Sequence, residues 1–204
     1  MKKLLLLSIA CAISASAMAQ TEKGAKYIGV NIGGVNYQNN KNGSSIGAAL
    51  LPSAGVFVAD NLLVGTGIQL SYLRNNSKPK GATEDNISRH IQYGLSPSVR
   101  YYFAGTNPHR FFGQLSGGIA WSNQYQKYQV NSETISSSTT SHYATASAAL
   151  GYNYFLTPGA ALEVTAGYTR NGIGESDFNY GQVVVSAGFA IFLPSKLSTT
   201  STGQ

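Results

Sequence analysis

Residues 182–193 read Gln-Val-Val-Val-Ser-Ala-Gly-Phe-Ala-Ile-Phe-Leu and alternate along most of their length. Large or apolar side chains fall on one side: Val183, Val185, Ala187, Phe189, Ile191 and Leu193. The opposite side carries Gln182, Ser186 and Gly188. Successive side chains of a strand point to opposite faces, so this pattern predicts a strand with one apolar face. Strands of this kind can close into a barrel with the apolar face outward, which is how a β-protein spans a membrane.

The N-terminus has the pattern of an export signal. A basic start, Met1-Lys2-Lys3, precedes an apolar run over residues 4–10, and Ala17-Met18-Ala19 is a small-x-small cleavage site. We therefore predict a cleaved signal peptide over residues 1–19, with Gln20 as the first mature residue. Cys11 raises the alternative of a lipoprotein, but the residues ahead of it lack the usual leucine three positions upstream.

Composition narrows the class of protein further. Without Cys11 the mature chain would contain no cysteine, so an exported domain of this size would need another source of stability, such as a closed hydrogen-bonded sheet. Removal of Lys2 and Lys3 lowers the formal net charge from +6 to +4. The remaining basic residues are scattered, which argues against nucleic acid as a partner. Glu and Lys are too few for long amphipathic helices.

Eight strand-like segments follow the signal, separated by connections that are alternately long and short. This order is typical of transmembrane barrels, which have short periplasmic turns and longer extracellular loops. We predict one barrel domain over residues 20–193 and a polar tail over residues 194–204. The expected strands are 26–37, 46–59, 62–74, 89–104, 110–123, 142–156, 160–170 and 178–193. The longest loop is expected at residues 124–141, which are rich in Ser and Thr.

Side-chain volume indicates which face of the barrel is outside. A soluble ligand-binding barrel also alternates, but the lumen of an eight-stranded barrel is only just filled by side chains. The apolar faces carry too many large groups for that lumen, whereas the opposite faces carry mostly small or polar residues. Aromatic residues also fall into two bands that suggest interfacial girdles: Tyr72, Trp121 and Tyr168 near the long loops, and Tyr101, Phe103, Phe111 and Tyr154 near the turns.

The chain resembles the small outer-membrane β-barrel proteins similar to outer membrane protein X and the barrel of outer membrane protein A. The resemblance covers roughly residues 26–193. It is carried by residues 54–62, Ala-Gly-Val-Phe-Val-Ala-Asp-Asn-Leu, followed by Gly65 and Gly67, and by residues 96–103, Ser-Pro-Ser-Val-Arg-Tyr-Tyr-Phe. It implies an integral location in the bacterial outer membrane, with lipid and lipopolysaccharide around a monomer.

The resemblance also implies insertion by the barrel assembly machinery. Relatives often end on an aromatic residue that this machinery reads. Here the segment that starts at Ser186 resembles the signal, but Leu193 stands at the aromatic position and eleven residues follow it.

Two charged residues lie inside the strands, away from their ends: Arg100 and Glu163. Both fall on the polar face, and each lies about six residues from a short connection, so they should have similar heights in the barrel. Their strands, the fourth and seventh, are nearly opposite in an eight-strand ring. We predict an ion pair across the lumen that plugs it, because a paired charge is far less costly to bury than an isolated one. The alternative is local hydrogen bonding of each side chain to other lumen residues.

Arg74 and Arg170 close the third and seventh strands at the long-loop end, just beyond Tyr72 and Tyr168. Both have the lipid-facing register. They could bind lipid A phosphates through bidentate hydrogen bonds. Simple solvation beside polar loops is the alternative.

The sequence favours a non-enzymatic protein with a structural or loop-mediated role at the cell surface. Barrel enzymes that modify the acyl chains of lipid A use His and Ser at the outer rim, and Ser88 with His90, or Ser141 with His142, imitates that composition. His109 is expected on the surface of a short turn. No His or Cys cluster has metal spacing and no cofactor motif is present, so no catalytic, metal or cofactor residues are assigned. A lipid A acyl-modifying enzyme and a narrow, low-conductance channel remain the alternatives.

Overall fold

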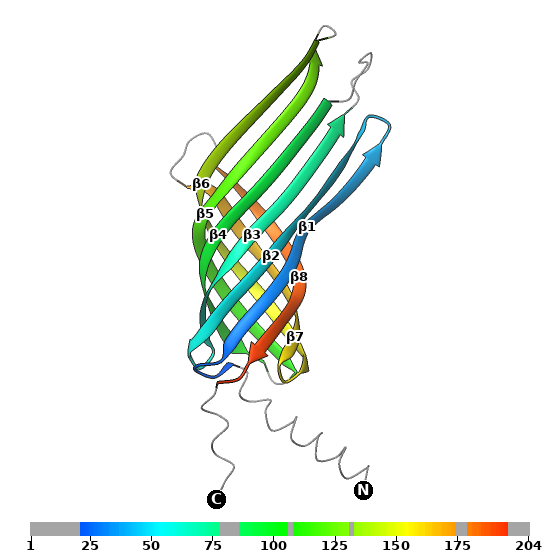
Figure 1. Cartoon of the computed structure of the whole chain (residues 1–204). Coiled ribbons are helices and arrows are strands. Elements are labelled where there is room, and N and C mark those ends of the chain that lie inside the picture. Colours follow the sequence, from blue (N-terminus) through cyan, green and yellow to red (C-terminus); the bar gives the residue numbers. More distant parts are fainter. Residues whose placement is uncertain (1–20, 78–85, 106–107, 131–132, 174–178, 196–204) are drawn as a thin grey trace, which may run out of the picture.

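The chain folds into a closed antiparallel barrel of eight strands in sequence order (Figure 1). The computed structural model describes residues 21–77, 86–105, 108–130, 133–173 and 179–195. The strands are β1 (Lys26–Asn40), β2 (Gly43–Ala59), β3 (Leu62–Ser77), β4 (Asn86–Ala104), β5 (His109–Val130), β6 (Glu133–Thr157), β7 (Ala160–Ile173) and β8 (Tyr180–Leu193). The predicted eight-stranded up-and-down barrel is confirmed. The predicted signal peptide and most of the polar tail, residues 196–204, lie outside the described residues.

Within the described part of the chain, no helix is both long and apolar enough to cross a membrane.

The two faces of the sheet differ as the alternation predicted. On β1, Tyr27, Gly29 and Asn31 are buried in the lumen, whereas the intervening apolar residues are exposed. The same outward apolar face continues around the ring. The residues of both predicted aromatic bands project outward: Tyr72, Trp121 and Tyr168 toward the outer end, and Tyr101, Phe103, Phe111 and Tyr154 toward the inner end. A surface of this kind suits hydrocarbon flanked by two interfaces.

The first residue of β1, Lys26, and the last residue of β8, Leu193, lie side by side at one end of the barrel, which is called the inner end here (Figure 1). Asn61 closes the β2–β3 turn with a φ of 64°, a left-handed conformation that Asn tolerates better than most residues. The segment before β1 folds against this turn. The Asn61 amide donates to the Thr21 carbonyl at 2.7 Å, and the Gly24 amide donates to the Phe57 carbonyl at 2.7 Å. Thr21 is buried, so this segment helps to cover the inner end of the lumen.

The inner part of the lumen contains a cluster of large apolar side chains. It consists of Tyr27, Phe57, Leu63, Tyr102, Phe112, Phe155 and Phe192, with Ala25, Ala161 and Ala190. The expectation of a lumen face made mostly of small and polar residues is therefore wrong at this end. The cluster fits because its rings meet in edge-on or tilted contacts, such as Phe155 with Phe192 at 4.9 Å between centroids.

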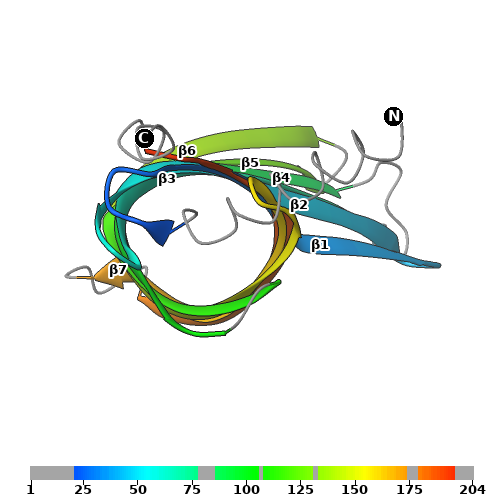
Figure 2. The same cartoon turned by 90° about the horizontal axis from the view of Figure 1, so that it is seen from below.

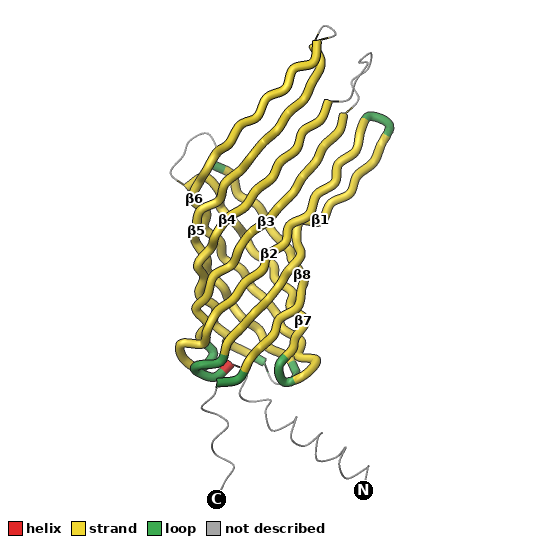
Figure 3. The backbone as a smooth tube through the Cα atoms, in the orientation of Figure 1, coloured by secondary structure: helices red, strands yellow, loops and turns green. Residues whose placement is uncertain are grey.

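At the outer end the strands are longer than predicted. Much of the expected loop at 124–141 is strand, since the β5–β6 ladder continues outward to Val130↔Glu133. The β1–β2 ladder likewise continues to Asn40↔Gly43. Figure 3 shows strands β1–β6 rising beyond the ends of β7 and β8. Ser and Thr can occupy such strands because Thr favours extended backbone and the ladder satisfies the main chain. Polar composition alone was a poor indicator of a loop.

Candidate functional site

The lumen contains an ion pair above the aromatic cluster, formed by Arg100 of β4 and Glu163 of β7. The Arg100 Nη1 lies 2.6 Å from the Glu163 Oε2, and the Nη2 lies 3.1 Å from the Oε1. The contact is bidentate. Arg100 is 4% exposed and Glu163 is 1% exposed. The structure thus brings together the two charged residues that sequence reasoning placed across the lumen.

Neutral donors and acceptors complete the shell around this pair. The Glu163 carboxylate also accepts from the Tyr27 hydroxyl at 3.1 Å, from the Asn31 amide at 2.8 Å and from the Asn153 amide at 3.1 Å. The Arg100 Nε donates to the Gln114 Oε1 at 2.9 Å. Several partners from different strands therefore hold the carboxylate, which offsets much of the desolvation cost of burying it.

Aromatic rings pack against the guanidinium from the inner side. Its Cζ lies 3.9 Å from the centroid of the Phe112 ring and 4.7 Å from that of Tyr27. Gly29 leaves space for the Tyr27 hydroxyl, because a Cβ at Gly29 would overlap it. The ion pair and the rings together lie across the inner lumen. Figure 2 shows the barrel end-on, with the strands as a ring around this lumen.

Sequence reasoning missed the neutral partners of the pair. Asn31 and Asn153 have the same inward register as the glycines two positions before them. Tyr102, whose hydroxyl accepts from the Arg100 Nη1 at 3.3 Å, has the register of Arg100. Strand parity alone would have placed these side chains in the lumen. It does not say which of them contact the ion pair, because that depends on the shear between strands.

Arg74 and Arg170 lie on opposite walls of the barrel and do not form one site. Arg74 of β3 stands directly opposite Arg89 of β4 in the ladder, and Arg89 stands opposite Tyr125 of β5. The Arg89 Cζ lies 5.8 Å from the Tyr125 ring centroid. Arg170 of β7 is exposed and stands opposite Ala146 and Gly181. Sequence reasoning missed Arg89, although its parity with Ile91 places it on the lipid-facing side.

The histidines do not reproduce the Ser–His combinations considered from the sequence. His90 of β4 faces the lumen, and its Nε2 lies 2.7 Å from the Oγ of Ser122 on β5, not from Ser88. His142 is exposed and stands opposite Trp121. His109 begins β5 and its Nδ1 lies 2.5 Å from the Tyr152 hydroxyl. In the described residues, no acidic side chain hydrogen-bonds the His90 ring to orient it, as a catalytic Ser–His pair requires.

Comparison with known proteins agrees with this architecture. The sequence matches the family described as outer membrane protein beta-barrel domain over residues 4–197. The chain belongs to this family and is an integral protein of the outer membrane, where it associates with membrane lipids. No curated protein matches the sequence.

Solved structures with the same fold share little sequence with this chain. The outer membrane protein OprG from Pseudomonas aeruginosa is 15% identical, with a TM-score of 0.53, and the match covers 87% of this chain and 100% of that one. A major outer membrane protein from Thermus thermophilus is 13% identical, with a TM-score of 0.53, over 83% of this chain and 99% of that one. These matches show the fold alone.

Proposed function

We propose that this protein is a non-enzymatic outer-membrane barrel that binds a partner at the cell surface through its β5–β6 hairpin. The observation that carries the proposal is the length of this hairpin. The β6–β7 ladder ends at Ala144↔Ile173, whereas β5 and β6 stay paired out to Val130↔Glu133. Residues 133–140 of β6 are all exposed. The hairpin therefore offers a polar surface and a sheet edge that β7 does not cover.

An uncovered sheet edge favours a protein partner. Unpaired main-chain donors and acceptors on an edge strand can add a strand from another chain, with side chains on alternate faces setting specificity. The inner half of the barrel supports this role as an anchor. Its lumen is closed by the Arg100–Glu163 pair and the aromatic cluster, which argues against a channel.

The test shortens the hairpin without touching the barrel. Gln126 and Ser137 are opposite each other, so Asn-Gly can join them directly and replace residues 127–136. A matched control shortens β1–β2 by joining Gln38 and Ser45 in the same way. Both variants should show heat-modifiable migration in detergent gels. Surface cross-linking on intact cells followed by purification should yield a partner with the full chain and the control, but not with the shortened β5–β6 hairpin.

Two results would reject the proposed function. One is recovery of the same partner with the variant whose β5–β6 hairpin is shortened. The other is a change in the lipid A acyl pattern that depends on the protein and disappears in His90→Ala or His142→Ala, measured by mass spectrometry. Steady conductance in planar bilayers would instead support the channel alternative. Insertion by the barrel assembly machinery and a monomeric state remain part of the proposal.

We also propose that the outer rim binds lipid A phosphates, through Arg74 together with Arg89 and separately through Arg170. Like charges directly opposite each other destabilise a sheet, and a phosphate between Arg74 and Arg89 would reverse that effect. Tyr72 lies two residues inward from Arg74 on β3, and Tyr93 lies four residues inward from Arg89 on β4, so the cluster has the height of lipid headgroups.

The amount of lipopolysaccharide that co-purifies with each variant distinguishes the Arg74–Arg89 site from the Arg170 site. The double variant Arg74→Ala with Arg89→Ala should lose most of the co-purified lipopolysaccharide, whereas Arg170→Ala should lose less, because it removes a single charge. Arg110→Ala at the inner end is the matched control and should lose none. A second double variant combines Arg74→Ala with Arg170→Ala. If both double variants keep their lipopolysaccharide and their thermal stability, these arginines do not bind lipid A phosphates and are only solvated.

A further inference from the structure

The contact between the first and last strands is incomplete. The β1–β8 ladder begins at Lys26↔Leu193 and ends at Gly33↔Ser186. Both strands continue beyond this point: β8 pairs with β7 as far as Asn171↔Tyr180, and β1 pairs with β2 as far as Asn40↔Gly43. In the described structure the facing edges of residues 34–40 and 180–185 therefore lack a ladder partner. We call this opening the β1–β8 seam.

The opening originates at two consecutive glycines of β1. Gly34 has a φ of 59°, in the left-handed region that side-chain-bearing residues rarely adopt. The β1–β2 register shifts between Gly33 and Asn36. β1 therefore bends away from β8 after Gly33 and follows β2 outward, as Figure 1 shows.

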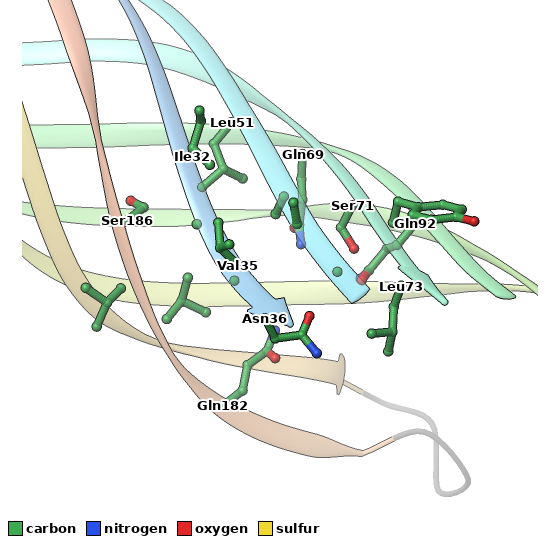
Figure 4. A pocket seen from close by; sticks show the side chains of 18 of the residues that line it. Ile32, Val35, Asn36, Leu51, Gln69, Ser71, Leu73, Gln92, Gln182 and Ser186 are labelled. Carbon is green, nitrogen blue, oxygen red and sulfur yellow. The ribbon is translucent and has the colours of Figure 1, made fainter. Parts of the chain in front are cut away.

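A cavity of about 840 Å³ fills the outer lumen and reaches the seam. Figure 4 shows Val35 and Asn36 on β1, Gln182 and Ser186 on β8, and other lining side chains on the strands beyond. The lining combines inward polar residues with outward apolar ones. The polar group includes Gln69, Ser71, Gln92 and His90, and the apolar group at the opening includes Ile32, Val183 and Val185. The cavity is thus open to the lipid side as well as to the lumen.

The seam opens at the depth of the outer leaflet. A tilted strand gains roughly 2.5 Å of height per residue, so Gly33 lies about 18 Å above Lys26, within an apolar band about 25 Å tall. Val183, which is 76% exposed, and Val185 border the opening above that level. Unpaired main-chain groups are costly in hydrocarbon, so this edge needs a polar partner.

We propose that the cavity binds a neutral single-chain amphiphile that enters through the β1–β8 seam from the outer leaflet. Its polar head lies against the amide and hydroxyl groups of the cavity and the open strand edges, and its chain leaves between Ile32 and Val183. The uncharged head follows from the lining, in which the described residues include no Asp, Glu, Lys or Arg and the Nε2 of His90 lies 2.7 Å from the Ser122 Oγ. A carboxylate head would lose its hydration without gaining a cationic partner. The volume falls in the range of small-molecule sites.

The test uses the full processed chain in phosphatidylcholine nanodiscs and a tryptophan reporter. The chain has a single tryptophan, Trp121, which faces the lipid. Trp121→Phe removes it, and Ser71→Trp in that background places an indole in the cavity. The probe is the monoglyceride of dibromostearic acid, whose bromine atoms quench tryptophan on contact. The reporter should show saturable quenching, whereas Trp121 in the unmodified chain should show only the gradual quenching expected of bulk lipid.

Two further variants separate the cavity from the lipid surface. Ala49 lines the cavity, and Ala49→Phe should weaken saturable quenching at least tenfold. Ala146 projects outward from β6 away from the cavity, and Ala146→Phe should change it less than twofold. Heat-modifiable migration confirms that each variant is folded.

Three outcomes would overturn the proposal. The first is quenching of the reporter that rises only gradually with the probe, as for Trp121. The second is relief of the quenching by free stearate, which carries no bromine, at a concentration equal to that of the monoglyceride, which would contradict the neutral head. The third is elution of the chain as a dimer with its reporter protected from the probe, which would show that a strand from a second copy fills the seam.

Discussion

The inner and outer halves of this barrel are built from the same strands but differ in packing. In the inner half, β1 and β8 are paired and the lumen is filled by rings and by the Arg100–Glu163 pair. In the outer half, β1 leaves β8 after Gly33 and the lumen holds a large cavity. The difference shows that closure of the sheet and filling of the lumen can be confined to one end. The other end is then free to bind molecules, at a cost in local stability.

The largest difference between the halves should come from the ion pair. Arg100→Met leaves the Glu163 carboxylate buried without its cation, and we expect a loss of about 3–5 kcal/mol in the free energy of unfolding. Glu163→Gln should also be destabilising. Urea unfolding in lipid vesicles measures both variants and the double variant. If the pair interacts as the 2.6 Å contact indicates, the single effects should not add, with a coupling of about 1–3 kcal/mol. Additive effects would show that the pair contributes little to stability.

Two leucines on β3 compare the packing of the halves directly. Leu63 is buried in the inner cluster, whereas Leu73 is only partly buried and lines the outer cavity. We expect Leu63→Ala to cost about 2–5 kcal/mol, since it leaves a void among closely packed rings. Leu73→Ala should cost less than about 1 kcal/mol, because its neighbours already border open space. Equal losses in the same unfolding assay would contradict the contrast between the halves.

Sequence reasoning reached the fold but not the asymmetry between the halves. Alternation gave the strands and their outward face, because a period of two is a local property of the chain. It also placed Arg100 and Glu163 in the lumen. The inner cluster was missed although Phe57, Phe112 and Phe192 have the inward register. The narrow lumen of an eight-stranded barrel predicted small inward side chains, and it did not predict that several rings could pack together at one end.

Features that depend on contacts between distant strands could not be predicted. Arg89 lies opposite Arg74 only because of the β3–β4 register, and Ser122 meets His90 only because of the β4–β5 register. The early end of the β1–β8 ladder depends on a bend at Gly34 that composition does not reveal, because glycine is also common in straight strands of this chain.

Hydrogen exchange should locate the boundary between the halves on β8. Amides of residues 187–193 that face β1 lie in a ladder, whereas those of residues 180–185 that face β1 have no ladder partner in the described structure. We expect exchange in the second group to be about 100-fold faster or more, because no ladder bond has to open first. Amides of the same residues that face β7 are the internal control. Equal protection of both groups would show that the seam is closed in the membrane.

The smallest change in the free energy of unfolding should come from the bend in β1. Alanine substitutions at two glycines, Gly34 and Gly117, measure it. Gly34→Ala places a side chain in the left-handed region, which costs roughly 1–2 kcal/mol unless the bend relaxes. Gly117 on β5 is exposed in extended backbone with ordinary space for a Cβ, so Gly117→Ala should stabilise by about 0.5–1 kcal/mol. The sign of the Gly34 result is informative. A stabilised Gly34→Ala variant, with newly protected amides in residues 180–185, would mean that β1 can straighten and pair with β8. The bend at Gly34 would then lower the stability of the folded barrel, and that loss of stability would be the cost of keeping the β1–β8 seam open.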